Sequence, residues 1–195
     1  MDVPDRHPRG HSTRAALVAA ARALFTERGY SGVGTEEVVE HAGVTRGALY
    51  HHFRDKRDLF RAVFQQMEGE IVNEILARIS DADTQDPLEA LGIGIRTFLN
   101  VCEDPRMTQV GLIDAPSVLG WAEWRQIGAD HGLALIVEAL RGAKDAGLLR
   151  GVEVAPLAHL LLAALGEAAM YIANAKDRAA ARREMETALF TLLER

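Results

Sequence analysis

Side chains suited to contacting nucleic acid are concentrated in residues 35–56, the stretch TEEVVEHAGVTRGALYHHFRDK. An arginine such as Arg46 can reach a phosphate oxygen or the acceptor edge of guanine. Hydroxyl, imidazole and ammonium groups bind phosphate oxygens, and small residues let a helix approach the bases closely. The residues of this stretch that could contact DNA are Thr45, Arg46, Gly47, Ala48, Tyr50, His51, His52 and Lys56.

Two short helices joined by a tight turn would present these side chains together. Thr35 or Gly34 begins the first helix, and Gly43 stands where a helix commonly ends in the left-handed conformation. Thr45 is a favourable N-cap for the second helix, which we predict over residues 46–52. Such a helix-turn-helix places the outer face of its second helix in the major groove. An ordinary αα-hairpin with a polar outer face has the same pattern, so the spacing leaves both interpretations open.

The longer string AGVTRGALYHHFRDKRDLF closely resembles the DNA-binding signature of the tetracycline repressor (TetR) family, and the resemblance covers residues 13–64. It implies an all-α protein with an N-terminal three-helix helix-turn-helix domain and a larger helical domain for ligand binding and dimerisation. It also implies a DNA-binding transcriptional regulator, typically a repressor that releases its operator when a small, mostly apolar ligand binds. The resemblance further implies that Thr35, at the start of the first helix of the motif, contacts a DNA phosphate.

Charge is distributed unevenly along the 195 residues, of which 48% are hydrophobic. The net charge is −6, yet residues 1–62 hold ten Lys and Arg against eight Asp and Glu, whereas residues 63–195 hold twelve against twenty. The end that resembles a DNA-binding domain is therefore the more positive end. The single cysteine, Cys102, excludes an internal disulfide and fits a reducing compartment. The polar start MDVPDRHPRGHS does not resemble a signal peptide, so we expect a cytoplasmic protein.

The hydrophobic pattern predicts about nine helices in three parts. We expect a flexible arm over residues 1–11, the helix-turn-helix domain over 12–56 and the ligand-binding and dimerisation domain over 57–195. Besides the two helices of the motif, the predicted helices cover residues 12–28, 55–80, 88–101, a short piece between 105 and 116, 121–149, 154–173 and 177–194. The helix over 55–80 is long enough to reach from the DNA-binding turn into the second domain, so it can transmit a tilt.

The most apolar stretch, residues 154–173, has the length of a membrane-spanning helix. It contains His159 and Glu167, lacks a basic flank before it and is rich in Ala and Gly. Apolar helices of this kind are normally buried in a large core or an interface. We therefore expect no membrane partner.

Aromatic and polar side chains within the apolar helices of the second domain are the candidates for a ligand site, because binding cavities are mostly apolar with a few polar groups. The candidates are Phe64, Met67, Phe98, Asp114, Trp121, Trp124, His131, Glu167 and Tyr171. Ordinary core packing is the alternative for each aromatic residue, and a hydrogen-bonded pair at a dimer seam is the alternative for His159 and Glu167. His, Cys, Asp and Glu do not occur at metal-ligand spacing, so we expect no metal and no cofactor.

By the resemblance, the last two predicted helices pair with their copies in a homodimer. Their apolar positions also form a surface too continuous for one small domain to cover. The predicted interface residues are Leu157, Leu160, Leu161, Ala164, Ala168, Met185, Leu189, Leu192 and Leu193. Two-fold symmetry would require a pseudo-palindromic double-stranded operator whose half-sites are about one helical turn, or a multiple of it, apart.

A different class of protein is the second interpretation: an all-helical small-molecule-binding protein or enzyme whose helix-turn-helix is inert. The sequence contains no glycine-rich phosphate loop, no nucleophile elbow and no GxGxxG after a strand. We therefore expect no enzyme. The predicted partners are operator DNA, a small-molecule effector and a second copy of the chain.

Overall fold

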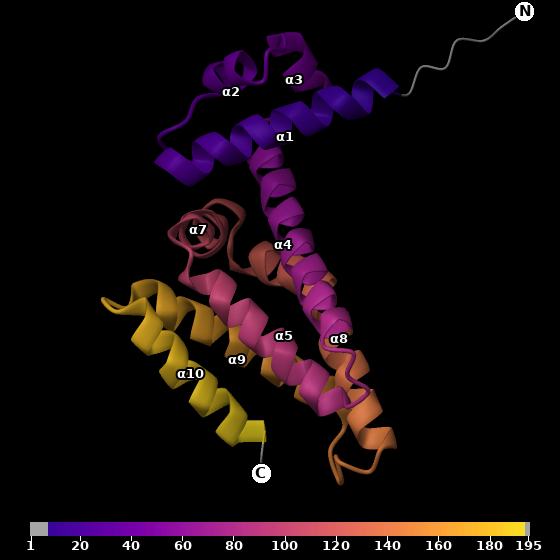
Figure 1. Ribbon diagram of the computed structural model, residues 1–195. Coiled ribbons are helices and arrows are strands. Elements are labelled where there is room, and N and C mark those ends of the chain that lie inside the picture. The colour runs from indigo at the N-terminus through magenta and orange to yellow at the C-terminus, as the bar shows by residue number, and fades with distance from the viewer. Residues whose placement is uncertain (1–7, 194–195) are drawn as a thin grey trace, which may run out of the picture.

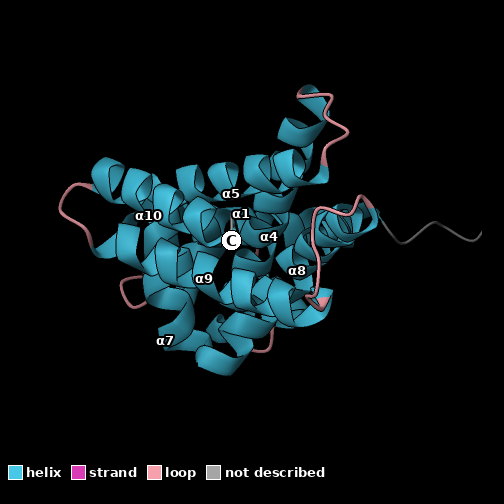
Figure 2. Cartoon of the chain, turned by 90° about the horizontal axis from the view of Figure 1, so that it is seen from below, coloured by secondary structure: helices cyan, strands magenta, loops and turns pink. Residues whose placement is uncertain are grey.

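The computed structural model describes residues 8–193, which form helices and connecting loops without a strand (Figures 1 and 2). Within this range a short π-helix, η1, joins α6 to α7 without a break. If this run counts as one helix, the described residues form nine, as predicted, and the all-α prediction is confirmed. The elements are α1 (Pro8–Arg28), α2 (Thr35–His41), α3 (Arg46–His52), α4 (Lys56–Asp81), α5 (Pro87–Glu103), α6 (Pro105–Met107), η1 (Thr108–Asp114), α7 (Ala115–Leu119), α8 (Trp121–Asp145), α9 (Val154–Asn174) and α10 (Arg178–Leu193).

The first helix differs from its predicted bounds. It begins at Pro8 rather than at residue 12, because proline has a φ that suits the first position of a helix and needs no N–H partner there. Residues 8–11 of the predicted arm are therefore helical, and residues 1–7 lie outside the described part. In the second half of the chain, α8 stops at Asp145, four residues before its predicted end. The division into domains stays a prediction.

Local capping sets the helix starts in the N-terminal part. The N–H of Gly34 donates to the Glu37 carboxylate at 2.8 Å before α2, and the Asp55 carboxylate accepts the N–H of Asp58 at 2.7 Å at the start of α4. Gly43 ends the first helix of the motif with φ +64°, a conformation that glycine adopts readily. The predicted roles of Gly34 and Gly43 at the two ends of the first motif helix are confirmed.

The helix-turn-helix rests on α1, which lies across one end of α4 (Figure 1). Val38 of α2 and Leu49 of α3 are fully buried against Phe25 of α1 and Phe60 of α4. This core also includes Val110, Ala115, Leu119 and Ile127, which belong to the segment η1–α7–α8. The first three helices, α1, α2 and α3, form the head. The head is therefore packed directly on the second half of the chain.

A second core is formed by α5, α8, α9 and α10, which lie side by side in the lower part of the molecule (Figures 1 and 2). Leu99, Leu140 and Ile172 are fully buried in it. Within the described range, α9 is the one helix that is long and apolar enough to cross a membrane by length and composition alone, features that the core helix of a soluble protein shares. Its buried residues pack against α5, α8 and α10, which accounts for part of its apolar character, because 33% of its most apolar window is buried in the single chain.

Candidate nucleic-acid interface and cavity

The outer face of α3 carries the predicted DNA-contacting side chains into solvent. The Thr45 hydroxyl accepts the N–H of Ala48 at 3.2 Å and so caps the helix. Leu49 faces inward and anchors it. Among the nine predicted residues, the exposed ones are Thr45, Arg46, Gly47, Tyr50 and His51, and the half-buried ones are Thr35, Ala48, His52 and Lys56.

Arg46 is held only by weak surface contacts. Its Nη1 lies 3.4 Å from Oε1 of Glu36, and both side chains are 68% exposed. Its guanidinium carbon lies 5.6 Å from the ring centroid of Tyr50. Ion pairs as exposed as this contribute little free energy, so the Arg46 guanidinium can exchange Glu36 for a phosphate or a base edge.

No neighbouring atom lies so close to Gly47 that a larger residue would be excluded. A Cβ built there would meet only the Thr45 hydroxyl oxygen, at 3.9 Å. Glycine inside a helix is less stable than alanine by up to about 1 kcal/mol. The isolated chain gains nothing from this residue, which favours a role in close approach to a partner outside the chain.

His52 and Lys56 are half-buried, unlike the exposed Arg46, Tyr50 and His51 of the predicted interface. Burial lowers the pKa of His52, helped by His51 and Arg14, which favours the neutral imidazole. Burial also lowers the pKa of Lys56, whose Nζ lies 4.0 Å from the ring centroid of Tyr30. A neutral imidazole can still donate a hydrogen bond to phosphate. Contact of either residue with DNA stays a prediction.

Arg14 is a basic residue at this interface that the sequence analysis did not identify. It is exposed on α1, and its guanidinium carbon lies 5.2 Å from the ring centroid of Phe53, the residue that follows α3. The two residues are far apart in the chain, so no local pattern indicates this proximity.

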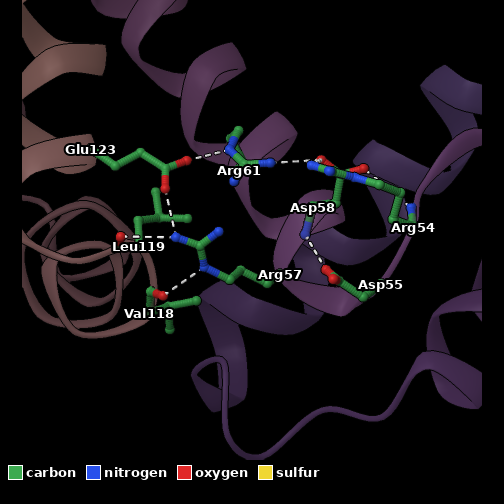
Figure 3. A network of polar contacts seen from close by, with 8 residues as sticks. All are labelled: Arg54, Asp55, Arg57, Asp58, Arg61, Val118, Leu119 and Glu123. Atoms are coloured by element: carbon green, nitrogen blue, oxygen red, sulfur yellow. Dashed lines mark hydrogen bonds and ion pairs between the residues drawn. The ribbon is translucent and has the colours of Figure 1, made fainter.

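Two arginines of α4 bind the start of α8 (Figure 3). Arg57 donates to the carbonyl oxygens of Val118 and Leu119 at 3.1 and 2.9 Å, and to the Glu123 carboxylate at 2.5 Å. Arg61 donates to the other oxygen of Glu123. The hydrogen bond from Arg61, followed by that from Arg57, lowers the pKa of Glu123. The carboxylate therefore stays charged and joins the head to the second domain.

The π-helix η1 makes a second connection between the two parts. At its end, the Asp114 carboxylate accepts the backbone N–H of Tyr30 at 2.7 Å. Within it, the carbonyl oxygen of Gly111 accepts the indole N–H of Trp124 at 2.9 Å. One seven-residue segment thus contacts both the loop after α1 and an aromatic side chain of α8.

A cavity of about 690 Å³ lies between α4, α5, α8 and α9, a size that suits a drug-sized ligand. Of the nine predicted ligand residues, those that line it are Phe64, Phe98, Trp121, Trp124 and Glu167. The lining also contains Glu68, which the sequence analysis overlooked. Its spacing of four residues from Phe64 and three from Ile71 places it on the apolar side of α4, and this signal was available in the sequence.

The other four predicted ligand residues lie outside the cavity lining. Met67 is buried in the first core, and Asp114 binds Tyr30 as described. The ring Nδ1 of His131 lies 2.8 Å from the carbonyl oxygen of Ile127. Tyr171 is exposed, and its hydroxyl donates to Glu184 at 3.4 Å. These four side chains would therefore not touch a ligand that occupies the cavity. The ligand contacts of the other five residues stay predictions.

The predicted dimer residues do not all face outward. Leu161, Ala168 and Leu189 are buried in the second core of the chain itself, so they cannot form a free surface. Leu160 and Leu192 are 69% and 72% exposed. The half-buried members are Leu157, Ala164, Met185 and Leu193. An interface on α9 and α10 would therefore centre on the exposed leucines.

Within the described residues, no three His, Cys, Asp or Glu side chains are grouped so that they could hold a metal ion.

Residues 17–63, which include the whole helix-turn-helix, match the family described as "Bacterial regulatory proteins, tetR family". Residues 88–195, which carry most of the cavity lining, match "Tetracyclin repressor-like, C-terminal domain". The chain belongs to the TetR family. The resemblance of the sequence is thereby confirmed.

A solved TetR-family transcriptional regulator from Pectobacterium atrosepticum is similar over nearly the whole length. It is 32% identical, with a TM-score of 0.82 over 97% of this chain and 96% of that one. The Tn10 TetC protein of Escherichia coli is 30% identical over 62% of this chain and 59% of its own length. The repressor BepR of Brucella suis is 35% identical over 50% of this chain and 46% of its own. The chain thus spans about half the length of these curated relatives.

Proposed function

We propose that this TetR-family chain is a DNA-binding transcriptional regulator that acts as a homodimer and releases its operator when a small molecule occupies the cavity. The observation that carries the proposal is the outer face of α3, where Arg46, Tyr50 and His51 are exposed beside a glycine that the fold does not require. The names of relatives such as BepR, which is called a transcriptional repressor, support it.

The contacts around α8 support a route from the cavity to the head. Trp121 and Trp124 line the cavity, and Glu123 lies between them in the chain and binds Arg57 and Arg61 of α4. A ligand that moves either indole would shift the first turn of α8 and with it the start of α4. Because α4 begins four residues after α3 ends, such a shift would re-orient the DNA-contacting helix.

The size of this effect is limited by the preference of the ligand for one of the two arrangements. Coupling between two sites typically amounts to about 1–3 kcal/mol. In a homodimer the spacing of the two α3 helices must match the half-site spacing of the operator. A small shift would occur in both subunits, and each would change this spacing.

The exposed apolar side chains of α9 and α10 support the proposed dimer. Leu160, Tyr171 and Leu192 are large and lie in solvent in the single chain. A second copy related by a two-fold axis would cover the same residues on both chains. The cytoplasmic location and the absence of catalysis remain part of the proposal, in keeping with a regulator of DNA.

A gel-shift assay with the DNA upstream of the gene tests the proposal. We expect the wild-type protein to bind, and Arg46→Ala to weaken binding at least about tenfold, as loss of one good base or phosphate contact does. Arg78→Ala is the matched control, because Arg78 is an exposed arginine near the far end of α4. Equal binding by the two variants would contradict the assignment of α3 as the DNA-contacting helix.

A further inference from the structure

Glu68 is a carboxylate without a polar partner inside a largely apolar cavity. It projects from the middle of α4 and lines the cavity with Phe64 and Ile71. In the part of the chain that the structure describes, it makes no hydrogen bond and no ion pair. The titratable groups that face it are the Cys102 thiol of α5 and the His131 ring of α8. Burial raises its pKa to about 7, which records how poorly the charge is solvated there.

The remaining charges of the lining are mostly negative. Glu138 and Glu167 lie at exposed positions of α8 and α9, and Arg125 is the one basic residue among the described residues of the lining. With three carboxyl groups and one guanidinium, the ionisable side chains of the lining favour a net negative charge in the cavity. An anionic ligand would be repelled by Glu68 at the centre of the apolar wall.

Four aromatic side chains form part of the lining, which is otherwise mostly aliphatic. Phe64, Phe98, Trp121 and Trp124 all line the cavity, and the ring centroids of the two tryptophans are 4.8 Å apart. The faces of aromatic rings attract cations, tryptophan most strongly, and quaternary ammonium groups are bound in this way. The aromatic rings and the half-buried Glu68 carboxylate together suit a ligand that has an apolar body and a positive charge.

We propose that the cavity binds hydrophobic organic cations, with the Glu68 carboxylate as their counterion and the aromatic side chains around their apolar body. A buried carboxylate that gains a cation loses most of the penalty of its burial. The proposal names the ligand class of the regulator proposed above and rests on that function only for the effect on DNA, because binding to the cavity is measured without DNA.

The two tryptophans give a direct assay, since the chain contains two and both line the cavity. Their fluorescence is titrated at pH 8 with decyltrimethylammonium, 1-decanol and decanoate, which share an apolar chain and differ in charge. We expect decyltrimethylammonium, which is attracted to the carboxylate and to the ring faces by its charge alone, to bind at least about tenfold more tightly than decanol, and decanoate to bind most weakly. Absence of cation binding, or equal or tighter binding of decanol or decanoate, would overturn the proposal.

Variants assign the effect to Glu68. Glu68→Gln keeps the shape and removes the charge, and we expect it to weaken decyltrimethylammonium at least about tenfold while leaving decanol within about twofold. Glu74→Gln is the matched control: Glu74 is on the same helix, exposed and paired with Arg78 away from the cavity. Unchanged cation affinity in Glu68→Gln would refute the counterion role. The comparison of the three wild-type titrations does not depend on how well a variant folds.

A gel shift with the same cation separates the two proposals. Cation binding that leaves operator affinity unchanged would overturn the ligand-responsive function and support the ligand class. Operator binding that responds to another compound, while decyltrimethylammonium does not bind, would overturn the ligand class and support the function.

Discussion

Replacing Glu68 by glutamine should stabilise the folded protein at neutral and alkaline pH. In the folded chain, burial raises the pKa of this carboxyl from its ordinary value of 4.5 to about 7, and the electrostatic interaction with His131 opposes the rise. The ionised form is therefore destabilised relative to the unfolded chain, where water solvates it. Glutamine has nearly the same shape and carries no charge that must be desolvated.

The magnitude follows from the pKa difference. A shift from 4.5 to about 7, at about 1.4 kcal/mol per pKa unit, gives an upper limit of about 3.5 kcal/mol. Because the side chain faces a cavity that can admit water, we expect about 2–3 kcal/mol. The folded state binds the extra proton, so the stability that Glu68 contributes is fully present below pH 4.5 and is lost as pH rises through about 7. The advantage of glutamine is therefore small near pH 4.5 and complete above pH 7.

Urea unfolding followed by circular dichroism measures this difference. The wild-type protein and Glu68→Gln are compared at one protein concentration between pH 5 and pH 8, because unfolding of a dimer depends on concentration. Glu74→Gln should show no growing advantage with pH. An advantage of Glu68→Gln that is the same at pH 5 and pH 8, or is absent at both, would show that the carboxylate is well solvated and would remove the physical basis of the proposed cation site.

The other predictions concern DNA binding, coupling and assembly. Gly47→Ala should weaken operator binding in a gel shift without lowering the melting temperature, because the chain has room for the methyl group. Lys56→Ala should weaken all DNA sequences similarly and lower the slope of log affinity against log salt by about one unit; an unchanged slope would remove Lys56 from the interface. Glu123→Gln should reduce the loss of operator affinity on adding decyltrimethylammonium, since it weakens the contacts with α4. Leu160→Asp should shift the sedimentation coefficient to that of a monomer, and an unchanged dimer would place the interface elsewhere.

Features that depend on neighbours within a few residues were predictable from the sequence. The caps of Thr45 and Asp55 and the left-handed Gly43 each involve residues no more than four positions apart, so the order of residue types determines them. The same holds for the division of α3 into a buried face with Leu49 and an exposed face with Arg46, because a helix repeats every 3.6 residues. The family signature lies in this stretch for that reason.

Features that depend on which helices meet were decided by the tertiary structure. Asp114 and Tyr30 are 84 positions apart, and their hydrogen bond places Asp114 between the two parts of the chain instead of in the cavity. Leu189 and Leu192 are both apolar residues of α10, yet one is buried in the core of the chain and the other is exposed. Periodicity groups residues on one side of a helix, but the neighbouring helices determine whether that side meets a core, a cavity or solvent. The sequence places Glu68 on the apolar side of α4, but only the packing of α4, α5, α8 and α9 decided that this side faces a cavity.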